Sequence, residues 1–331
     1  MALLQVPLPV AWGREGLEVI RRDFYLPKSK LYAERPDKKQ PAFNWDVGVM
    51  ISALNAAARY DSKYKIWLRE YANASRVYWN KGGYDVLPGP KPFDRYYDDN
   101  AWMALALAET YEVLGDKKYL RWAREALDFA LSGEAKDGGI YWREKERSSR
   151  NTCACAPTAA ACLAIYRITH DIALLNKAQA IYQWTIEHLQ DPADGLFWDA
   201  LSNSGQIEST KWSYNTALMI RTAVDLQEQD RLKKMLTSSR SRWLKNGKLD
   251  DVGRFAHLLL EAWVRADGVK EDYINSLSQV QKNRSAKGYY PSHWSKQEVA
   301  QNPELLDQAS FVRACFLLGN AAGKPHLRMR P

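Results

Sequence analysis

Apolar residues recur along the chain with the helical period of about 3.6 residues, and alternating strand patterns are almost absent. Six segments are rich in alanine and apolar on most sides, which predicts helices that are buried all round. They begin near Asp46, Asp98, Pro157, Ser213, Asp250 and Asp307. Six further segments are amphipathic, with one charged face: residues 15–25, 63–79, 117–131, 171–189, 229–244 and 270–281. The sequence therefore predicts an all-α protein.

The buried and amphipathic segments alternate, so the predicted structural unit is a helical hairpin. The starts of the buried segments lie 52, 59, 56, 37 and 57 residues apart. Helical repeats of this length build either an open solenoid or a closed ring. Six pairs favour closure, which predicts an (α/α)6 barrel (toroid) of six hairpins with the buried helices inside. No change in composition divides residues 1–331, so we expect a single domain.

The links between the segments are unequal in length. A buried segment is followed by a short link, whereas most buried segments are preceded by a long one: residues 26–44, 80–97, 132–152, 190–210 and 284–304. Long loops commonly carry binding residues, and in a barrel of hairpins all of these would lie at one end. They also contain many of the aromatic residues, which suit stacking on sugar rings or nucleobases. That end is the predicted functional face.

Composition and charge exclude some classes of protein. The net charge of +8 would suit a nucleic-acid partner. However, the densest basic run, residues 231–248, has the apolar spacing of an amphipathic helix and no nucleic-acid-binding motif, so we expect no nucleic-acid partner. Cys153 and Cys155 lack a second ligand pair, so we expect no metal and no cofactor. The sequence contains no run of about 18 apolar residues, so we expect no membrane span. We expect a monomer.

The start of the chain bears on the location of the protein. Residues 1–12 are mildly apolar, but they lack a basic region and a cleavage site. Either no signal peptide exists or it has been removed. The protein is expected to be cytoplasmic in the first case and secreted or periplasmic in the second.

Two adjacent acids, Asp98 and Asp99, lie where a polar loop passes into a buried helical pattern, in the stretch YYDDNAW. One interpretation is capping, because Asp is a favoured N-cap and acids in the first turn complement the helix dipole. Asp250 and Asp251 form a second pair at an equivalent position. The other interpretation is glycoside hydrolysis, which needs one ionised carboxylate and one protonated carboxyl group. A helix N-terminus keeps one acid anionic, and an anionic neighbour raises the pKa of the other.

The sequence resembles glycoside hydrolase family 76, the endo-α-1,6-mannanases. The resemblance rests on YYDDNAW followed by an alanine-rich helix, and on further blocks in the same order along most of the chain. These are NWDVGVMISAL, GGIYW with the region of Asn151, DGLFWD and WSYNTA. The family has an (α/α)6 fold, in agreement with the six predicted hairpins. The resemblance departs at Thr216-Ala217, where the family commonly has Gln-Gly.

The resemblance implies a retaining mechanism on α-1,6-mannosidic linkages, with Asp98 as nucleophile and Asp99 as general acid/base. It implies that Trp45, Tyr97, Asn151, Asp199, Trp212, Tyr214 and Asn215 line the subsites. Asp46 and Trp142, which lie in the matching blocks, and Asp251 complete the expected substrate-binding set. The expected partner is a mannan-like polysaccharide or oligosaccharide. The departure at residues 216–217 leaves the preferred linkage and chain length open.

Three other functions fit the predicted fold. Sugar epimerases of this architecture use histidine pairs, and here only His257 and His293 are suitably placed among five histidines. Hydrolases of unsaturated uronides act on acidic sugars, which would suit the positive charge. A non-catalytic carbohydrate-binding relative would keep the aromatic residues without turnover. The presence of both Asp98 and Asp99 favours an enzyme over this last alternative.

Overall fold

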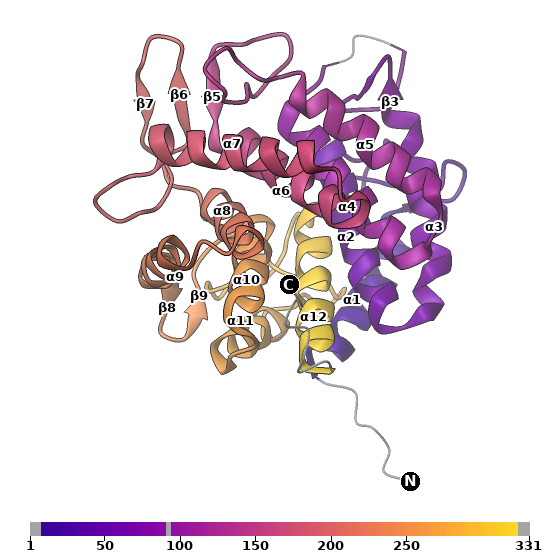
Figure 1. The fold of residues 1–331 in the computed structure, drawn as a ribbon. Coiled ribbons are helices and arrows are strands. Elements are labelled where there is room, and N and C mark those ends of the chain that lie inside the picture. The colour runs from indigo at the N-terminus through magenta and orange to yellow at the C-terminus, as the bar shows by residue number, and fades with distance from the viewer. Residues whose placement is uncertain (1–7, 91–93, 324–331) are drawn as a thin grey trace.

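The computed structural model describes residues 8–90 and 94–323, and within these ranges twelve α-helices make up most of the chain (Figure 1). Six inner helices correspond to the predicted buried segments: α2 (Asn44–Tyr60), α4 (Tyr97–Leu114), α6 (Thr152–Thr169), α8 (Ser213–Leu226), α10 (Gly253–Asp267) and α12 (Leu305–Gly323). Six outer helices correspond to the amphipathic segments: α1 (Leu8–Asp23), α3 (Lys65–Ala74), α5 (Lys117–Leu131), α7 (Ile172–Leu189), α9 (Gln229–Trp243) and α11 (Glu271–Lys282).

The inner helices close into a ring. Each packs against the next inner helix along the chain, and α12 packs against α2 as well as α10. The first outer helix, α1, covers α12, so segments from the two ends of the chain lie side by side (Figure 1). This contact closes the barrel, and the prediction of an (α/α)6 toroid is confirmed. An open solenoid would have left α2 and α12 apart.

Small residues allow the inner helices to pack on all sides. Helix α6 shows this most clearly, because every residue from Thr152 to Ile165 is buried. By length and composition this helix could cross a bilayer, but 78% of it is buried inside the protein. A core helix and a membrane span share this apolar composition, and α6 is covered mostly by other parts of the protein. The alanine-rich pattern is therefore satisfied by the barrel itself.

Three helices begin at positions that differ from the prediction. Helix α6 starts at Thr152, so Pro157 is its sixth residue and lacks one backbone hydrogen bond within the helix. Helix α1 already begins at Leu8. Helix α10 starts at Gly253, because the backbone around Asp250 and Asp251 is bonded to neighbouring loops.

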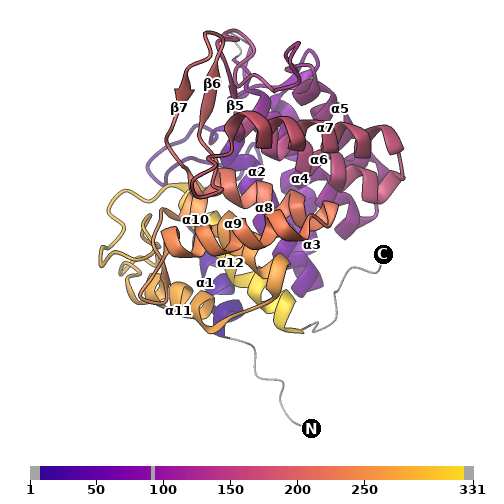
Figure 2. The same cartoon turned by 60° about the vertical axis from the view of Figure 1, so that its left-hand side comes forward.

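Short strands order the loops that lead into the inner helices. They are β1 (Tyr25–Leu26), β2 (Leu31–Tyr32), β3 (Trp79–Asn80), β4 (Gly83–Tyr84), β5 (Ser149–Asn151), β6 (Ala200–Ser202), β7 (Ile207–Glu208), β8 (Leu244–Lys245) and β9 (Lys248–Leu249). The 3-10 helices η1 (Ser62–Tyr64) and η2 (Ser75–Tyr78) flank α3. All strand pairs are antiparallel, and β5 pairs with β6 from the following loop. Figure 2 shows β6 and β7 extending past the helices at one end of the barrel.

Candidate active site

Asp98 and Asp99 lie in the first turn of the inner helix α4. Tyr96 has the extended backbone of an N-cap residue and its side chain makes no capping hydrogen bond. Tyr97 is the first helical residue, so the two acids occupy the second and third helical positions. The hypothesis that one of them is the N-cap residue is wrong. They instead lie where the backbone N–H groups and the positive end of the helix dipole stabilise negative charge.

The start of α4 is held in place by Asn100, which is fully buried. Its amide nitrogen donates to the backbone oxygens of Tyr84 (3.0 Å) and Tyr96 (2.9 Å), and its Oδ1 accepts from the Tyr84 N–H at 2.7 Å. The amide therefore ties β4 to the first turn of the helix. These hydrogen bonds fix the first turn of α4, which carries Asp98 and Asp99.

The two carboxyl groups have different surroundings. Asp98 Oδ2 accepts a hydrogen bond from the indole Nε1 of Trp142 at 3.1 Å. Burial raises the pKa of Asp98 to about 7, although backbone N–H groups and the Trp142 indole oppose this rise. Burial raises the pKa of Asp99 well above its ordinary value, and the nearby carboxylates of Asp98, Asp46 and Asp94 raise it further. Asp98 is thus the member of the pair that ionises more readily.

Asp46 is a third acid close to this pair, in the first turn of α2. Its side chain is buried, and burial raises its pKa to about 8, although the positive charge of Arg254 opposes the rise. Arg254 is itself bonded to Asp307, at 3.3 and 3.0 Å, and to Glu304. Because one cation faces several acids, Asp46 favours its neutral form near pH 7.

Aromatic side chains form a wall centred on Phe255 of α10. The Phe255 ring stacks on Tyr214 with centroids 4.5 Å apart and on Trp45 at 6.0 Å, and Trp212 lies 5.7 Å from it. Trp212 is 40% exposed. The sequence prediction included the other three residues but missed Phe255, although it follows the Asp250-Asp251 pair at a helix start. Stacked rings of this kind suit the flat apolar face of a sugar.

Polar residues at the starts of α6 and α8 form a second group. Asp199 is half-buried and accepts a hydrogen bond from the buried Asn215 amide at 3.3 Å. Asn151 is the N-cap residue of α6, and its Oδ1 accepts from Ser149 at 2.7 Å. The Asn215 Oδ1 is buried and has no hydrogen-bond partner among the described residues. Because Asn215 has no exposed surface, it does not itself contact a substrate in this conformation, and its amide instead holds the carboxylate of Asp199.

Tyr97 and residues 216–217 lie away from the accessible surface. Tyr97 is fully buried, stacks on Phe129 at 5.2 Å, and accepts a hydrogen bond from Arg147 at 2.6 Å. A side chain without exposed surface cannot contact a substrate in this conformation, so the structure does not place Tyr97 in a subsite. Thr216 and Ala217 are also buried. The departure from the family pattern therefore concerns packing rather than the exposed surface.

Asp250 and Asp251 precede their helix instead of lying within it. The N-cap residue of α10 is Val252, and its backbone N–H donates to Asp251 Oδ1 at 2.7 Å. Asp250 is exposed and accepts a hydrogen bond from Ser295. Burial raises the pKa of Asp251, whereas hydrogen bonding, including that from the Val252 N–H, opposes that rise. The second pair thus differs from the first in both position and partners.

The two histidines considered for an epimerase do not form a pair. His257 is buried within the barrel, and its Nδ1 lies 3.2 Å from Arg313 Nη1. His293 lies in the loop before α12, 3.4 Å from Ser295 Oγ. Within residues 8–90 and 94–323, no group of three or more His, Cys, Asp or Glu side chains has the geometry of a metal site.

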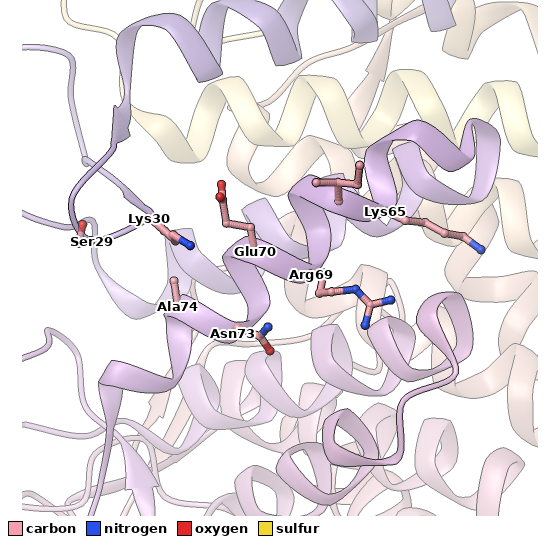
Figure 3. Close-up of a pocket in the computed structure, with 8 residues that line it drawn as sticks. Ser29, Lys30, Lys65, Arg69, Glu70, Asn73 and Ala74 are labelled. Carbon is pink, nitrogen blue, oxygen red and sulfur yellow. The ribbon is translucent and has the colours of Figure 1, made fainter.

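Two open pockets lie outside this group of residues. One follows the outer wall of the barrel along α3, where Ser29 and Lys30 face Arg69, Glu70 and Asn73 (Figure 3). The other lies between α9 and neighbouring loops and is lined by residues that include Asp194, Arg242 and Asp250. Neither contains Asp98 or Asp99. The pockets therefore do not define the candidate active site.

The fold and the site together define a carbohydrate-active toroid, with paired acids and aromatic side chains at one end of a helical barrel. The sequence model of glycosyl hydrolase family 76 matches residues 22–253, which is more than half of the chain. The chain belongs to glycosyl hydrolase family 76. A search of curated proteins found no match.

Solved structures of the same fold cover nearly the whole chain. An α-mannanase of this family from Bacteroides thetaiotaomicron is 29% identical, with a TM-score of 0.89 over 95% of this chain and 96% of that one. A family 76 mannosidase from the same species is 17% identical, with a TM-score of 0.88 over 96% and 100%. An inactive α-1,6-mannanase variant from Salegentibacter sp. HEL1_6, bound to α-1,6-mannotriose, is 19% identical, with a TM-score of 0.81 over 94% and 99%. In that variant two consecutive aspartates are changed to asparagine.

Proposed function

We propose that the protein is a retaining glycoside hydrolase that cleaves α-1,6-mannosidic linkages in mannan-type glycans. The observation that carries the proposal is the unequal environment of two adjacent acids in the first turn of α4. The linkage is supported by the similarity to solved α-mannanases, one of which was bound to α-1,6-mannotriose. The whole chain would act as one catalytic domain.

Asp98 is the proposed nucleophile. The Trp142 indole and the backbone N–H groups of the first turn donate toward its carboxylate, which favours the anion. The anion attacks the anomeric carbon of the sugar, and the bond from that carbon to the leaving oxygen breaks. This step produces a glycosyl ester on Asp98.

Asp99 is the proposed general acid/base. Burial and the negative charge of Asp98 keep its proton in place, so that it can protonate the leaving oxygen as the glycosidic bond breaks. In the second step the Asp99 carboxylate removes a proton from water, which attacks the anomeric carbon; the bond from that carbon to the Asp98 oxygen breaks and the sugar is released. Side chains at adjacent helical positions diverge by about 100°, so the two groups can serve two sides of one bond.

The subsites would be built from the aromatic wall and the polar group. Apolar faces for the sugar rings would come from Trp45, Trp212 and Tyr214, each of which contacts the ring of Phe255. Asp199, which is half-buried, would bind a hydroxyl group, and the buried Asn215 would orient its carboxylate through their hydrogen bond. We include Asp46, Asn151 and Asp251 in the proposed substrate-binding set. Carboxylates and amides next to aromatic faces are the groups that fix the orientation of a sugar.

The release of reducing sugar from linear α-1,6-mannan tests the activity. We expect turnover by the wild type, and initial formation of the α-anomer by proton NMR because the mechanism retains configuration. The β-anomer as first product would disprove retention. Binding of mannan without release would identify a non-catalytic relative, and turnover of an unsaturated uronide but not of mannan would favour a uronide hydrolase.

A further inference from the structure

The loop that carries Trp142 is joined to the segment just before α4 by backbone hydrogen bonds. The Tyr97 N–H donates to the Trp142 backbone oxygen at 2.9 Å, and the Glu144 N–H donates to the Arg95 oxygen at 3.0 Å. These bonds accompany an antiparallel bridge between Tyr96 and Arg143. The backbone of residues 142–144 therefore runs alongside the entry to the catalytic helix.

Two ion pairs reinforce this junction. Arg95 Nε and Nη2 donate to the two carboxylate oxygens of Glu144, both at 2.8 Å. Arg143 Nε and Nη2 donate to the two oxygens of Asp94, at 3.2 and 2.7 Å. Both pairs are bidentate, a geometry that restricts orientation as well as distance. We call residues 94–97 and 142–144, with these contacts, the clamp.

The clamp brings the Trp142 side chain next to the acidic pair. Its ring packs against Tyr96, with centroids 5.1 Å apart and planes inclined by 54°. Its Nε1 lies 3.1 Å from Asp98 Oδ2. The ring is 43% exposed, so the indole is accessible to solvent while its N–H group is already bonded to the carboxylate. A residue that served only as a stacking platform would not need this bond.

We propose that Trp142 is a positioning residue for Asp98: its indole N–H orients the carboxylate for attack, and the clamp orients the indole. This role rests on the proposed function of Asp98 as nucleophile. A carboxylate with one oxygen bonded to a fixed donor has fewer orientations, so less ordering is needed to reach the transition state. The proposal assigns Trp142 to the chemical step in addition to any contact with the sugar.

A direct test follows the indole N–H by nitrogen–proton correlation NMR, with no substrate present. The Trp142 signal is assigned by its disappearance in Trp142→Phe. We expect this signal to shift with pH around a midpoint of about 7, the pKa of Asp98, and the shift to vanish in Asp98→Asn. A Trp142 signal that does not respond to pH would disprove the hydrogen bond. This result does not depend on whether the protein hydrolyses mannan.

Kinetics then tests the role in the reaction. Trp142→Phe keeps an aromatic ring and removes the donor, so we expect kcat to fall about 10- to 100-fold, the effect of losing a hydrogen bond to a charged group. KM should change by less than about threefold, since the stacking face is kept. The acidic limb of the kcat profile should move to higher pH, because the lost donor stabilised the carboxylate anion.

Trp212→Phe is the matched control, because Trp212 is similarly exposed and, among the described residues, its ring contacts Phe255 rather than either acid. It should raise KM and leave the acidic limb unmoved. Arg143→Lys breaks the bidentate pair with Asp94 and keeps the charge, and we expect an intermediate fall in kcat. The proposal is disproved if Trp142→Phe raises KM alone, as Trp212→Phe does, with the wild-type acidic limb. Thermal denaturation of each variant identifies losses that come from unfolding.

Discussion

Two pairs of adjacent aspartates lie near the starts of inner helices in the same barrel, but they differ in their position relative to the helix start and in their hydrogen-bond partners. Asp98 and Asp99 follow the N-cap residue of α4 and belong to its first turn. Asp250 and Asp251 come before the N-cap residue of α10 and belong to the preceding loop. A shift of a few residues relative to the helix start therefore decides whether a carboxylate meets the backbone N–H groups of the first turn.

The partners of the two pairs differ as well. Trp142 donates to Asp98, and other acids surround Asp99. By contrast, Asp250 is exposed and bonded to Ser295, while Asp251 accepts the Val252 N–H. Asp46, Asp98 and Asp99 lie close together and perturb each other's ionisation. A solvated carboxylate bonded to a hydroxyl group, such as that of Asp250, is a common surface feature. Two adjacent acids in a sequence therefore indicate a candidate active site only when their position relative to the helix start and their neighbours in space are also known.

The largest expected difference between the pairs is in turnover. Asp98→Asn and Asp99→Asn should each lower kcat on α-1,6-mannan by about 10³-fold or more, because each removes a group that takes part in bond breaking. The corresponding Asp250→Asn should stay within about twofold of wild type, since its carboxylate is exposed. Initial rates of reducing-sugar release measure all three. Comparable losses at both pairs would contradict the distinction.

The pH profile gives the next largest effect. Hydrolysis requires an ionised Asp98, so kcat/KM should fall about tenfold per pH unit below the pKa of about 7. The basic limb should lie higher, because the pKa of Asp99 is raised further. Rates between pH 4.5 and 9 test both limbs. An acidic limb near pH 4 would mean that the pKa of Asp98 is not raised in the folded protein.

Asp46→Asn tests the crowding of acids near the first pair. The pKa of Asp46 is about 8 in the folded protein and about 4 when unfolded. Between these values only the folded state binds the proton, so the wild type loses stability as pH rises from 4 to 8. The Asn variant lacks this loss, so relative to the wild type its unfolding free energy should rise by on the order of 4 kcal/mol between pH 5 and pH 8. Denaturant unfolding at pH 5 and pH 8 measures the gain.

The exposed Asp230 offers a control for this measurement. Asp230→Asn changes a side chain that is exposed to solvent, so its effect on the unfolding free energy should be small at both pH values. A pH-independent effect of Asp46→Asn would show that the folded protein does not hold its carboxyl group neutral.

Asp251→Asn should affect substrate binding more than turnover. The Asn oxygen can still accept the Val252 N–H, so the loop should keep its conformation while the charge is lost. We expect KM to rise several-fold, equivalent to about 1 kcal/mol, with kcat within about twofold of wild type. Steady-state kinetics separates the two constants. A fall in kcat as large as that of Asp98→Asn would place the second pair in the chemical step.

Helix periodicity was sufficient to predict the barrel, because buried and amphipathic helices follow different local patterns that need no knowledge of neighbours. The helix starts were less predictable. Loop hydrogen bonds set the start of α10, and the prediction near Pro157 missed the first turn of α6. These boundaries depend on backbone partners from other parts of the chain.

The site was predicted in part. Asp98 and Asp99 were identified from their position at a predicted helix start, whereas Trp45, Trp212 and Tyr214 were identified from the resemblance to the family. Phe255 was missed, and Tyr97 was expected at the surface although it is fully buried. Adjacent helical residues point about 100° apart, so Tyr97 faces the core while its neighbour Asp98 faces Trp142.

By itself the sequence determined the number and kind of helices, the long loops at one end and the resemblance to a hydrolase family. Local apolar periodicity and short ordered motifs carry that information. Only the tertiary structure decided which acidic pair lies inside a helical turn, which aspartate receives the Trp142 hydrogen bond and which acids crowd the other. Charge and hydrogen bonding act between residues that are close in space. Trp142 is 44 positions from Asp98, so folding alone brings them together.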